Sequence, residues 1–188
     1  AGIARIADTL GTNRAVMTAH EALVEQVARE MTRAGRIAWR GLMLRARVGG
    51  ATPEDAPRWC MAKPDVFSIR NTSVEAYAHP IVHEIKVRRA DLLADLKKPD
   101  KRAAYLDLGG ECWYVLGCDA RGRPIARADE IPDGCGVLLA QDGRLTVERA
   151  ATHRELERLP FQVWMALAKS QPMPGFDEDT QGLLNEGG

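Results

Sequence analysis

The amino-acid sequence predicts an α/β domain in which a central mixed β-sheet is flanked by helices. Apolar residues at helical spacing near the N-terminus, short apolar stretches typical of strands, and a second helical region between two of those stretches support this fold class. At 188 residues the chain has the length of one domain with a sizeable core. We assign residues 1–170 to this domain, with a loose start at 1–13. Residues 171–188, which are polar and rich in Gly and Pro, are expected to form a flexible tail.

The first predicted element is a helix over residues 18–35. Leu23, Val27 and Met31 repeat at helical spacing, and Gly35 marks the expected end of the helix.

The middle of the chain predicts strands. Residues 36–48 predict one strand, or two, and residues 49–63, with two Gly and two Pro, predict a loop. Residues 64–70 and 81–87 predict two further strands. The connection between them, residues 71–80, is rich in turn-forming residues, so a hairpin is the simplest geometry.

The second half of the chain alternates between helical and strand patterns. The remaining predicted elements are a mostly helical region at 89–110, a strand at 111–118, two strands at 135–141 and 144–150 around a turn, and a helix at 152–170. Pro99 is best placed in the first turn of the second half of the helical region. Pro160 is expected to interrupt the last helix.

Composition and charge narrow the function classes. The 26 basic residues balance 26 acidic residues, so a nucleic-acid-binding function has to be argued from local clusters of charge. No apolar run approaches the roughly 20 residues of a membrane span, and the N-terminal residues lack the pattern of a secretory signal. The four cysteines form no C-x-x-C pair, which favours reduced thiols in a cytoplasmic protein over a zinc or disulfide framework.

Glu84 and Lys86 are opposite charges in a stretch that otherwise has the pattern of a buried strand. Residues two apart in a strand share a face, so these two point one way while His83 and Ile85 point the other, which places His83 in the core. If the strand pairs with the preceding one as a hairpin, Asp65 converges with Glu84 beside Lys86. A surface salt bridge and a turn aspartate are the simpler interpretations of each feature alone, but the three residues together favour a site.

Two carboxylates and a lysine together suit phosphodiester hydrolysis. Mg²⁺ and Mn²⁺ prefer oxygen ligands, which Asp65, Glu84 and the Ile85 backbone carbonyl would supply. Lys86 would position or deprotonate the attacking water, or stabilise charge on the phosphoryl oxygens.

The sequence resembles a known nuclease signature. P-D at residues 64–65 followed by E-I-K at 84–86 looks like the PD-(D/E)XK motif, and the stretch from about 62 to 140 is similar to the MmcB-related DNA repair proteins. In that family the E-x-K strand leads into an A-D-F-x-A-D-x-K-x-P segment. The matching residues here are Ala90, Asp91, Ala94, Asp95, Lys97 and Pro99, with Leu92 where the family more often has an aromatic residue. The resemblance implies a restriction-endonuclease-like core and metal-dependent action on DNA.

A carboxylate from the first helix is a further candidate metal ligand, because related nucleases place one near the metal. Glu21 is the first candidate and Glu25 the alternative, but Glu21 also fits a capping box with Thr18. His20 is expected to pack against the apolar side of the helix. His79 lies in the connecting loop with access to a metal, but we do not assign it to the site.

Basic residues cluster after the E-I-K strand. Between residues 86 and 102 seven basic residues stand against three aspartates, and such a local excess suits phosphate contacts, although a solvated helix face of mixed charge is an equal alternative. Five of them are assigned to nucleic-acid binding: Arg88, Arg89, Lys97, Lys101 and Arg102. Trp59, in the predicted loop, is a minor candidate for stacking on a base.

From these observations we expect a metal-dependent nuclease that cleaves DNA in repair, recombination or mobile-element processing, using Asp65, Glu84 and Lys86 as its catalytic residues. The alternative is a non-catalytic DNA-binding or scaffold domain that keeps the nuclease fold. DNA is the expected partner, with a protein partner or a homodimer as further options, and no membrane.

Overall fold

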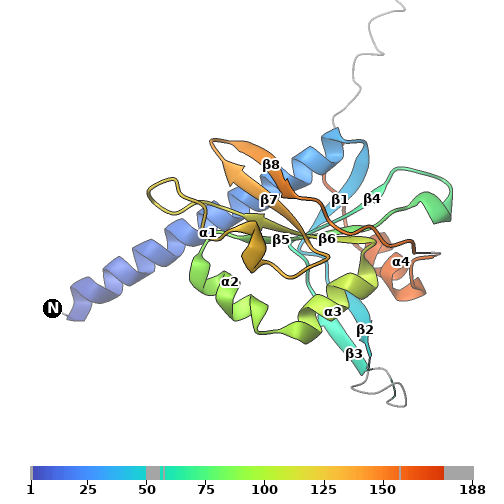
Figure 1. The fold of residues 1–188 in the computed structure, drawn as a ribbon, viewed down its shortest axis with the longest axis horizontal. Helices are drawn as coiled ribbons and strands as arrows, with labels where there is room; N and C mark the ends of the chain where they lie inside the picture. Colours follow the sequence, from blue (N-terminus) through green and yellow to red (C-terminus); the bar gives the residue numbers. More distant parts are fainter. Residues whose placement is uncertain (1, 50–55, 57, 157, 176–188) are drawn as a thin grey trace, which may run out of the picture.

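A six-stranded mixed β-sheet organises the computed structural model, which describes residues 2–49, 56, 58–156 and 158–175. Its strand order is β1-β4-β5-β6-β7-β8 (Figure 1). The strands are β1 (Arg36–Arg40), β4 (Val66–Arg70), β5 (Ile81–Lys86), β6 (Glu111–Leu116), β7 (Gly136–Gln141) and β8 (Arg144–Arg149). The three central strands β5, β6 and β7 are parallel, and β4, β1 and β8 are antiparallel to their neighbours. The prediction of an α/β domain with a mixed sheet is therefore confirmed.

Helices cover both faces of this sheet. Those in the described residues are α1 (Gly2–Arg33), α2 (Arg89–Leu96), α3 (Pro99–Leu108) and α4 (Phe161–Ala168), with short 3₁₀ turns η1 (Glu75–Tyr77) and η2 (Ala128–Glu130). On one face, Leu23 and Val27 of α1 pack in a cluster with Ile85 of β5. On the other, Leu108 of α3 belongs to a second cluster that contains Val82 of β5. The alternation of β5 residues between the two clusters is the period of two expected of a strand covered on both sides.

The prediction of a loop at residues 49–63 is wrong at its C-terminal end. Strands β2 (Leu44–Val48) and β3 (Arg58–Ala62) pair antiparallel as a separate two-stranded sheet, which packs on α3. The side chains of β2 alternate between buried and exposed. The Gly and Pro residues that suggested a loop fall between the two strands, whereas β3 is too short for its own pattern to predict a strand, and only the pairing with β2 reveals it. Trp59 lies on β3 and is exposed.

Helix α1 begins well before the predicted start. Residues 2–13, which we expected to be loose, continue the helix, and its N-terminal turns extend beyond the sheet (Figure 1). Thr18 is therefore inside the helix, where its hydroxyl donates to the backbone carbonyl of Arg14, four residues earlier. That bond satisfies the Thr18 side chain in the middle of a helix, so the capping box with Glu21 is wrong.

The C-terminal part of the domain differs from the prediction in one segment. Of the residues that the structure describes between 152 and 170, only those of α4 form a helix, and Pro160 is its N-cap. The preceding segment runs beside the sheet instead, because Thr152 N donates to Gly134 O and Arg154 N donates to Gly110 O. Within the expected tail, Met173 N donates to Ala38 O, so residues 171–175 are anchored on the sheet, while the remainder lies outside the described residues.

The prediction for Pro99 is confirmed. Pro99 stands in the first turn of α3, directly after α2 ends. All four cysteines are free thiols. Among the described helices none combines the length and the apolar character needed to cross a membrane.

Candidate functional site

Asp65 lies where the β4–β5 hairpin opens. The two strands are antiparallel, and their ladder ends at the pair of Val66 and His83. One residue beyond, Asp65 Oδ2 accepts a hydrogen bond from Ile85 N at 2.7 Å, so the aspartate side chain takes the place of a strand partner. The predicted hairpin is confirmed, and it brings Asp65 to the end of β5 that carries Glu84.

Glu84 and Lys86 share one face of β5, as expected. Lys86 Nζ donates to Glu84 Oε1 at 2.5 Å, and both side chains are largely buried, with 4% of Glu84 and 11% of Lys86 exposed. The pair is therefore not a surface salt bridge. His83 points to the opposite face and is buried, which confirms it as a core residue. Burial and the nearby charge of Arg36 lower the pKa of His83 to about 3, so its ring is neutral.

Four residues that sequence reasoning did not assign to the centre of the site complete a buried network around Glu84. Lys101 Nζ contacts Glu84 Oε1 at 2.6 Å and Asp95 Oδ1 at 2.7 Å. Tyr105 donates its hydroxyl to Glu84 Oε2 at 2.8 Å, and Tyr114 donates to Asp95 Oδ2 at 3.0 Å. The network thus alternates carboxylates with cations and hydroxyl donors.

One sequence signal for this network was available. Asp95 is an acid between two leucines of an otherwise apolar helix side, Leu92, which is buried, and Leu96, which is half-buried. A buried carboxylate needs a partner, so the pattern called for a nearby cation. Lys101 itself was assigned to DNA phosphates, and the bend at Pro99 between α2 and α3 turns it back onto Asp95 instead.

Electrostatics favour the charged forms of Asp95 and Lys101 and the protonated form of Tyr105. Burial alone would raise the pKa of Asp95, but the hydrogen bond from Lys101 and the charge of Lys86 outweigh it and hold this pKa below its usual value. Burial would likewise lower the pKa of Lys101, but the charge of Glu84 and the bonds to both carboxylates raise it. Burial, with the Glu84 charge, raises the pKa of Tyr105 far above neutrality, so its hydroxyl remains a donor.

Helix α1 lies beside Asp65 and contacts it through His20. His20 Nε2 is 3.5 Å from Asp65 Oδ2, and its side chain is 31% exposed. His20 therefore faces the candidate site, and the expectation that it packs against the apolar side of the helix is wrong. The hydrogen bond to Asp65 raises the pKa of His20, although burial opposes it.

The candidate helix carboxylates differ in their surroundings. A cavity of about 870 Å³ is lined by Glu21, Glu25, His20 and Asp65. Glu25 is paired with Arg29 at 2.5 Å and with Arg40 at 3.4 Å. Glu21 has no ion-pair partner among the described residues, so it is the freer of the two carboxylates.

The residues expected to hold a metal offer oxygen atoms, but not a tight cluster. Among described residues, the carboxylates of Asp65, Glu84 and Glu21 do not come within 4.8 Å of one another as a set. Asp65 Oδ1 accepts no bond from a described residue, and Ile85 O faces the same strand edge as Ile85 N, beyond the last β4 pair. Among described residues, Tyr105 alone donates to Glu84 Oε2. Mg²⁺ usually takes one or two carboxylates and completes its shell with water and phosphate, so this donor set fits it.

The expected nucleic-acid residues do not form one surface. Arg89 pairs with Glu130 at 2.6 Å and also donates to Ile125 O, and Lys101 belongs to the buried network. Arg102 buries one guanidinium nitrogen, Nη1, that has no hydrogen-bond partner among described residues. Arg88 and Lys97 are exposed.

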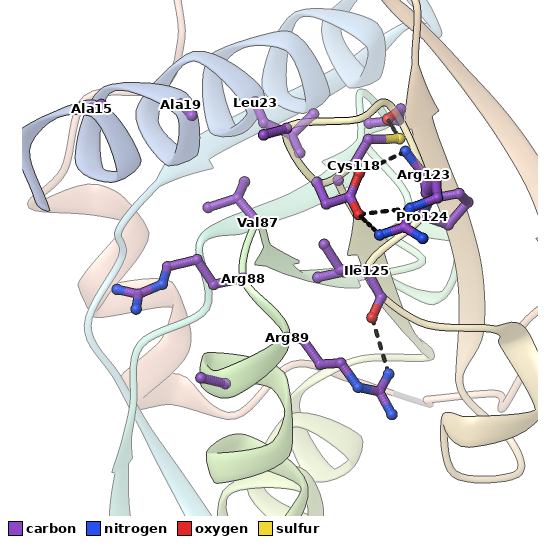
Figure 2. Close-up of a pocket in the computed structure, with 15 residues that line it drawn as sticks. Ala15, Ala19, Leu23, Val87, Arg88, Arg89, Cys118, Arg123, Pro124 and Ile125 are labelled. Atoms are coloured by element: carbon purple, nitrogen blue, oxygen red, sulfur yellow. Dashed lines mark hydrogen bonds and ion pairs between the residues drawn. The ribbon is translucent and has the colours of Figure 1, made fainter. Parts of the chain in front are cut away.

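Arg88 lies beside a cavity of about 1030 Å³ (Figure 2). Ala15 and Ala19 of α1 line one side, and the loop after β6, including Arg123, lines the other. Arg123 is paired with Asp119 at 2.8 Å, whereas Arg88 has no ion-pair partner among described residues. Val87, the residue that follows the end of β5 at Lys86, also lines this cavity.

Comparisons with known proteins give little beyond this geometry. No family model matches the chain, and no curated protein matches it. Among solved structures, the chain is similar to the SPO1766 protein of unknown function from Silicibacter pomeroyi. The two share 20% sequence identity with a TM-score of 0.47, and the match covers 76% of this chain and 77% of that chain. Neither result assigns a family or an activity to this chain.

Proposed function

We propose that this protein is a metal-dependent nuclease with a restriction-endonuclease-like core, and that it hydrolyses DNA phosphodiester bonds. The observation that carries the proposal is the hydrogen bond of Asp65 to Ile85 N, the residue between Glu84 and Lys86, where the β4–β5 ladder ends; Asp65 also lines a cavity. A strand pair that ends in two carboxylates and a lysine matches the PD-(D/E)XK signature, in spacing and in placement.

In this proposal Asp65, the Ile85 carbonyl and Glu84 hold Mg²⁺ or Mn²⁺, with Glu21 reaching the site from α1. The ion supplies Lewis-acid polarisation of the scissile phosphate. Lys86 directs its ammonium group at the Glu84 carboxylate, 2.5 Å away. From this position it would stabilise negative charge on the phosphoryl oxygens of a bound substrate. His20, within 3.5 Å of Asp65, orients that carboxylate from the helix side.

Arg88 is the basic residue best placed to contact a DNA backbone in this arrangement. It has no ion-pair partner among described residues and stands at the rim of the cavity that follows Lys86. Lys97 is exposed at the C-cap of α2, whereas Arg88 is the N-cap, so it would add a second contact at the other end of this helix. Such contacts to phosphate carry no sequence information, which suits a nuclease that recognises the structure of its substrate.

A second candidate function is a non-catalytic DNA-binding or scaffold domain with the same fold. The observation in its favour is the saturation of Glu84, whose carboxylate accepts from Lys86, Lys101 and Tyr105. A carboxylate held by three donors in the core can serve as a structural anchor without any ion. The two candidates differ in whether a divalent cation binds at Asp65.

Cleavage of labelled single-stranded, duplex, flap and junction DNA with Mg²⁺ or Mn²⁺ tests the proposal, using Asp65→Asn beside the wild type. Asparagine retains an oxygen to accept from Ile85 N but loses the charge. Because a metal supplies several kcal/mol of charge stabilisation, we expect a loss of at least about 100-fold in rate. Asp133→Asn is the matched control, since the Asp133 side chain is fully exposed and lies 4.0 Å from its partner Arg149.

The outcomes separate the two candidates. Metal-dependent cleavage that falls in Asp65→Asn and not in Asp133→Asn supports the nuclease. DNA binding without cleavage, together with no heat of Mg²⁺ binding that depends on Asp65, supports the scaffold. If Asp65→Asn and Asp133→Asn both cleave DNA at the wild-type rate, Asp65 is not part of the site and the proposed mechanism is refuted.

A further inference from the structure

We propose that His79, Glu111 and His153 form a binding site for a divalent transition-metal cation of the Zn²⁺ type. In the part of the chain that the structure describes, these three residues are the group whose His, Cys, Asp or Glu ligand atoms all lie within 4.8 Å of one another. They come from three distant segments: the turn before β5, the first residue of β6, and the segment after β8.

The site is separate from the candidate nuclease site. Ile81, the first residue of β5, is paired with Glu111 of the parallel strand β6, whereas Glu84 and Lys86 occupy the other end of β5. His79 and Glu111 therefore lie near the start of the parallel strands β5 and β6, and Lys86 lies at the opposite end of β5. The inference does not depend on the proposed function.

The distances between ligand atoms are close to those of a tetrahedral site. Zinc ligands at 2.0–2.1 Å from the metal lie roughly 3.3 Å apart in a tetrahedron. His153 Nδ1 is 3.4 Å from Glu111 Oε1, and His79 Nε2 is 3.7 Å from the same oxygen. His79 Nε2 and His153 Nδ1 are 2.5 Å apart, so one ring nitrogen donates a hydrogen bond to the other.

A cation would take the place of the proton shared by the two rings. The His79–His153 edge would then widen by about 0.8 Å to reach the roughly 3.3 Å of a tetrahedral edge. His153 can make this movement because its side chain is 44% exposed and its segment is not part of a helix or strand. The other two edges need shifts of about 0.1–0.4 Å by the same comparison.

The surroundings hold two of the ligands in place. Trp113 Nε1 donates to Glu111 Oε2 at 2.7 Å, which leaves Oε1 turned toward the histidines. Partners of this kind orient metal ligands in known sites. His79 has a positive φ of 46°, and its carbonyl accepts a hydrogen bond from Arg36. A left-handed backbone is uncommon for a residue other than glycine and often marks a functional position.

The ligand chemistry selects the class of cation. Two imidazoles and one carboxylate suit Zn²⁺, Co²⁺, Ni²⁺ or Fe²⁺, whereas Mg²⁺ and Ca²⁺ prefer oxygen ligands throughout. His79 and His153 also line a cavity of about 430 Å³, together with Arg70 and Tyr77. A fourth coordination position would open toward this cavity, as it does in zinc sites that keep a water or a small ligand.

Titration of the full-length, metal-stripped protein with Zn²⁺ by calorimetry tests the inference, with Co²⁺ absorption as a second readout. We expect one Zn²⁺ per chain. His153→Ala and Glu111→Gln should each weaken binding by at least about 10-fold, the lower end of the loss that is typical even for outer-shell partners. Glutamine at position 111 can still accept from Trp113, so this variant removes the charged ligand and retains the local packing.

Thermal unfolding gives an independent check that does not rely on activity. Zn²⁺ at about 100 times its wild-type Kd should raise Tm by about 5–10 °C in the wild type and by at most about half as much in His153→Ala. His20→Ala and Asp65→Asn are matched controls from the other site and should retain Zn²⁺ binding. Absence of Zn²⁺ binding in the wild type would overturn the inference. So would Zn²⁺ affinities of His153→Ala and Glu111→Gln that equal the wild-type affinity.

Discussion

Glu84→Gln should destabilise the fold strongly, because Glu84 belongs to a buried cluster of balanced charge. Two carboxylates, Glu84 and Asp95, face two ammonium groups, Lys86 and Lys101, so the cluster is neutral as a whole. Glutamine removes one negative charge and leaves an excess of one positive charge where Lys86 is only 11% exposed. Breaking a buried ion pair in this way costs about 3–5 kcal/mol of unfolding free energy.

A second substitution tests whether charge balance is the cause. Lys101→Met alone should cost less, about 1–3 kcal/mol, because its side chain is 30% exposed and water screens part of its charge. Combined with Glu84→Gln it restores neutrality between Lys86 and Asp95. The double variant should therefore be more stable than the sum of the single effects by about 1–3 kcal/mol.

Urea unfolding followed by circular dichroism measures these free energies. Glu148→Gln is the matched control, since Glu148 is exposed on β8 and has no ion-pair partner among described residues. It should change stability by less than about 0.5 kcal/mol. Strict additivity of Glu84→Gln and Lys101→Met, or a cost for Glu84→Gln no larger than that of the control, would refute the charge-balance argument.

Two further predictions concern other parts of the chain. The pKa of His20 is raised in the folded state, so its pairing with Asp65 stabilises the fold at pH values below the ordinary pKa of 6.5. This contribution is lost as pH rises through the folded-state pKa. His20→Gln should therefore be destabilising near about pH 5.5 and much less so near about pH 8.5. NMR titration should show the pKa of His20 falling in Asp65→Asn, and an unchanged value would contradict the pairing. Gly136→Ala should cost about 1–3 kcal/mol by urea unfolding, because the added Cβ would overlap the Trp113 indole. Gly49→Ala, where no atom lies within 4 Å of the added carbon, is the control, and equal stability of the two variants would rule out this overlap.

Local patterns predicted most elements of the sheet. The strands around residues 66–70, 81–86 and 111–116 carry their own signal in short apolar runs bounded by turn residues. Pro99 likewise marked the start of α3 correctly, because its fixed φ and missing N–H suit the first turn of a helix. Period-two alternation also placed Glu84 on one face of its strand and His83 on the other, which the structure confirms.

Long-range contacts decided the elements that the patterns missed. Strand β3 forms because it pairs with β2, and Thr152 and Arg154 lie beside the sheet because their backbone nitrogens donate to Gly134 and Gly110. Both depend on residues far away in the chain, which no local window contains. The same holds for His20, whose side of α1 is set by how the helix lies across the sheet beside Asp65.

The sequence by itself determined which charged residues need partners, and the tertiary structure decided which partners they have. Glu84, Lys86 and Asp95 stand out as charges within apolar segments, and the cost of burying a lone charge requires that each be compensated. That Lys101 completes this network, rather than contacting a nucleic acid, follows only from the packing of α2 and α3 on the sheet. Hydrophobic periodicity is a property of neighbours in the chain, whereas charge pairing is a property of neighbours in space.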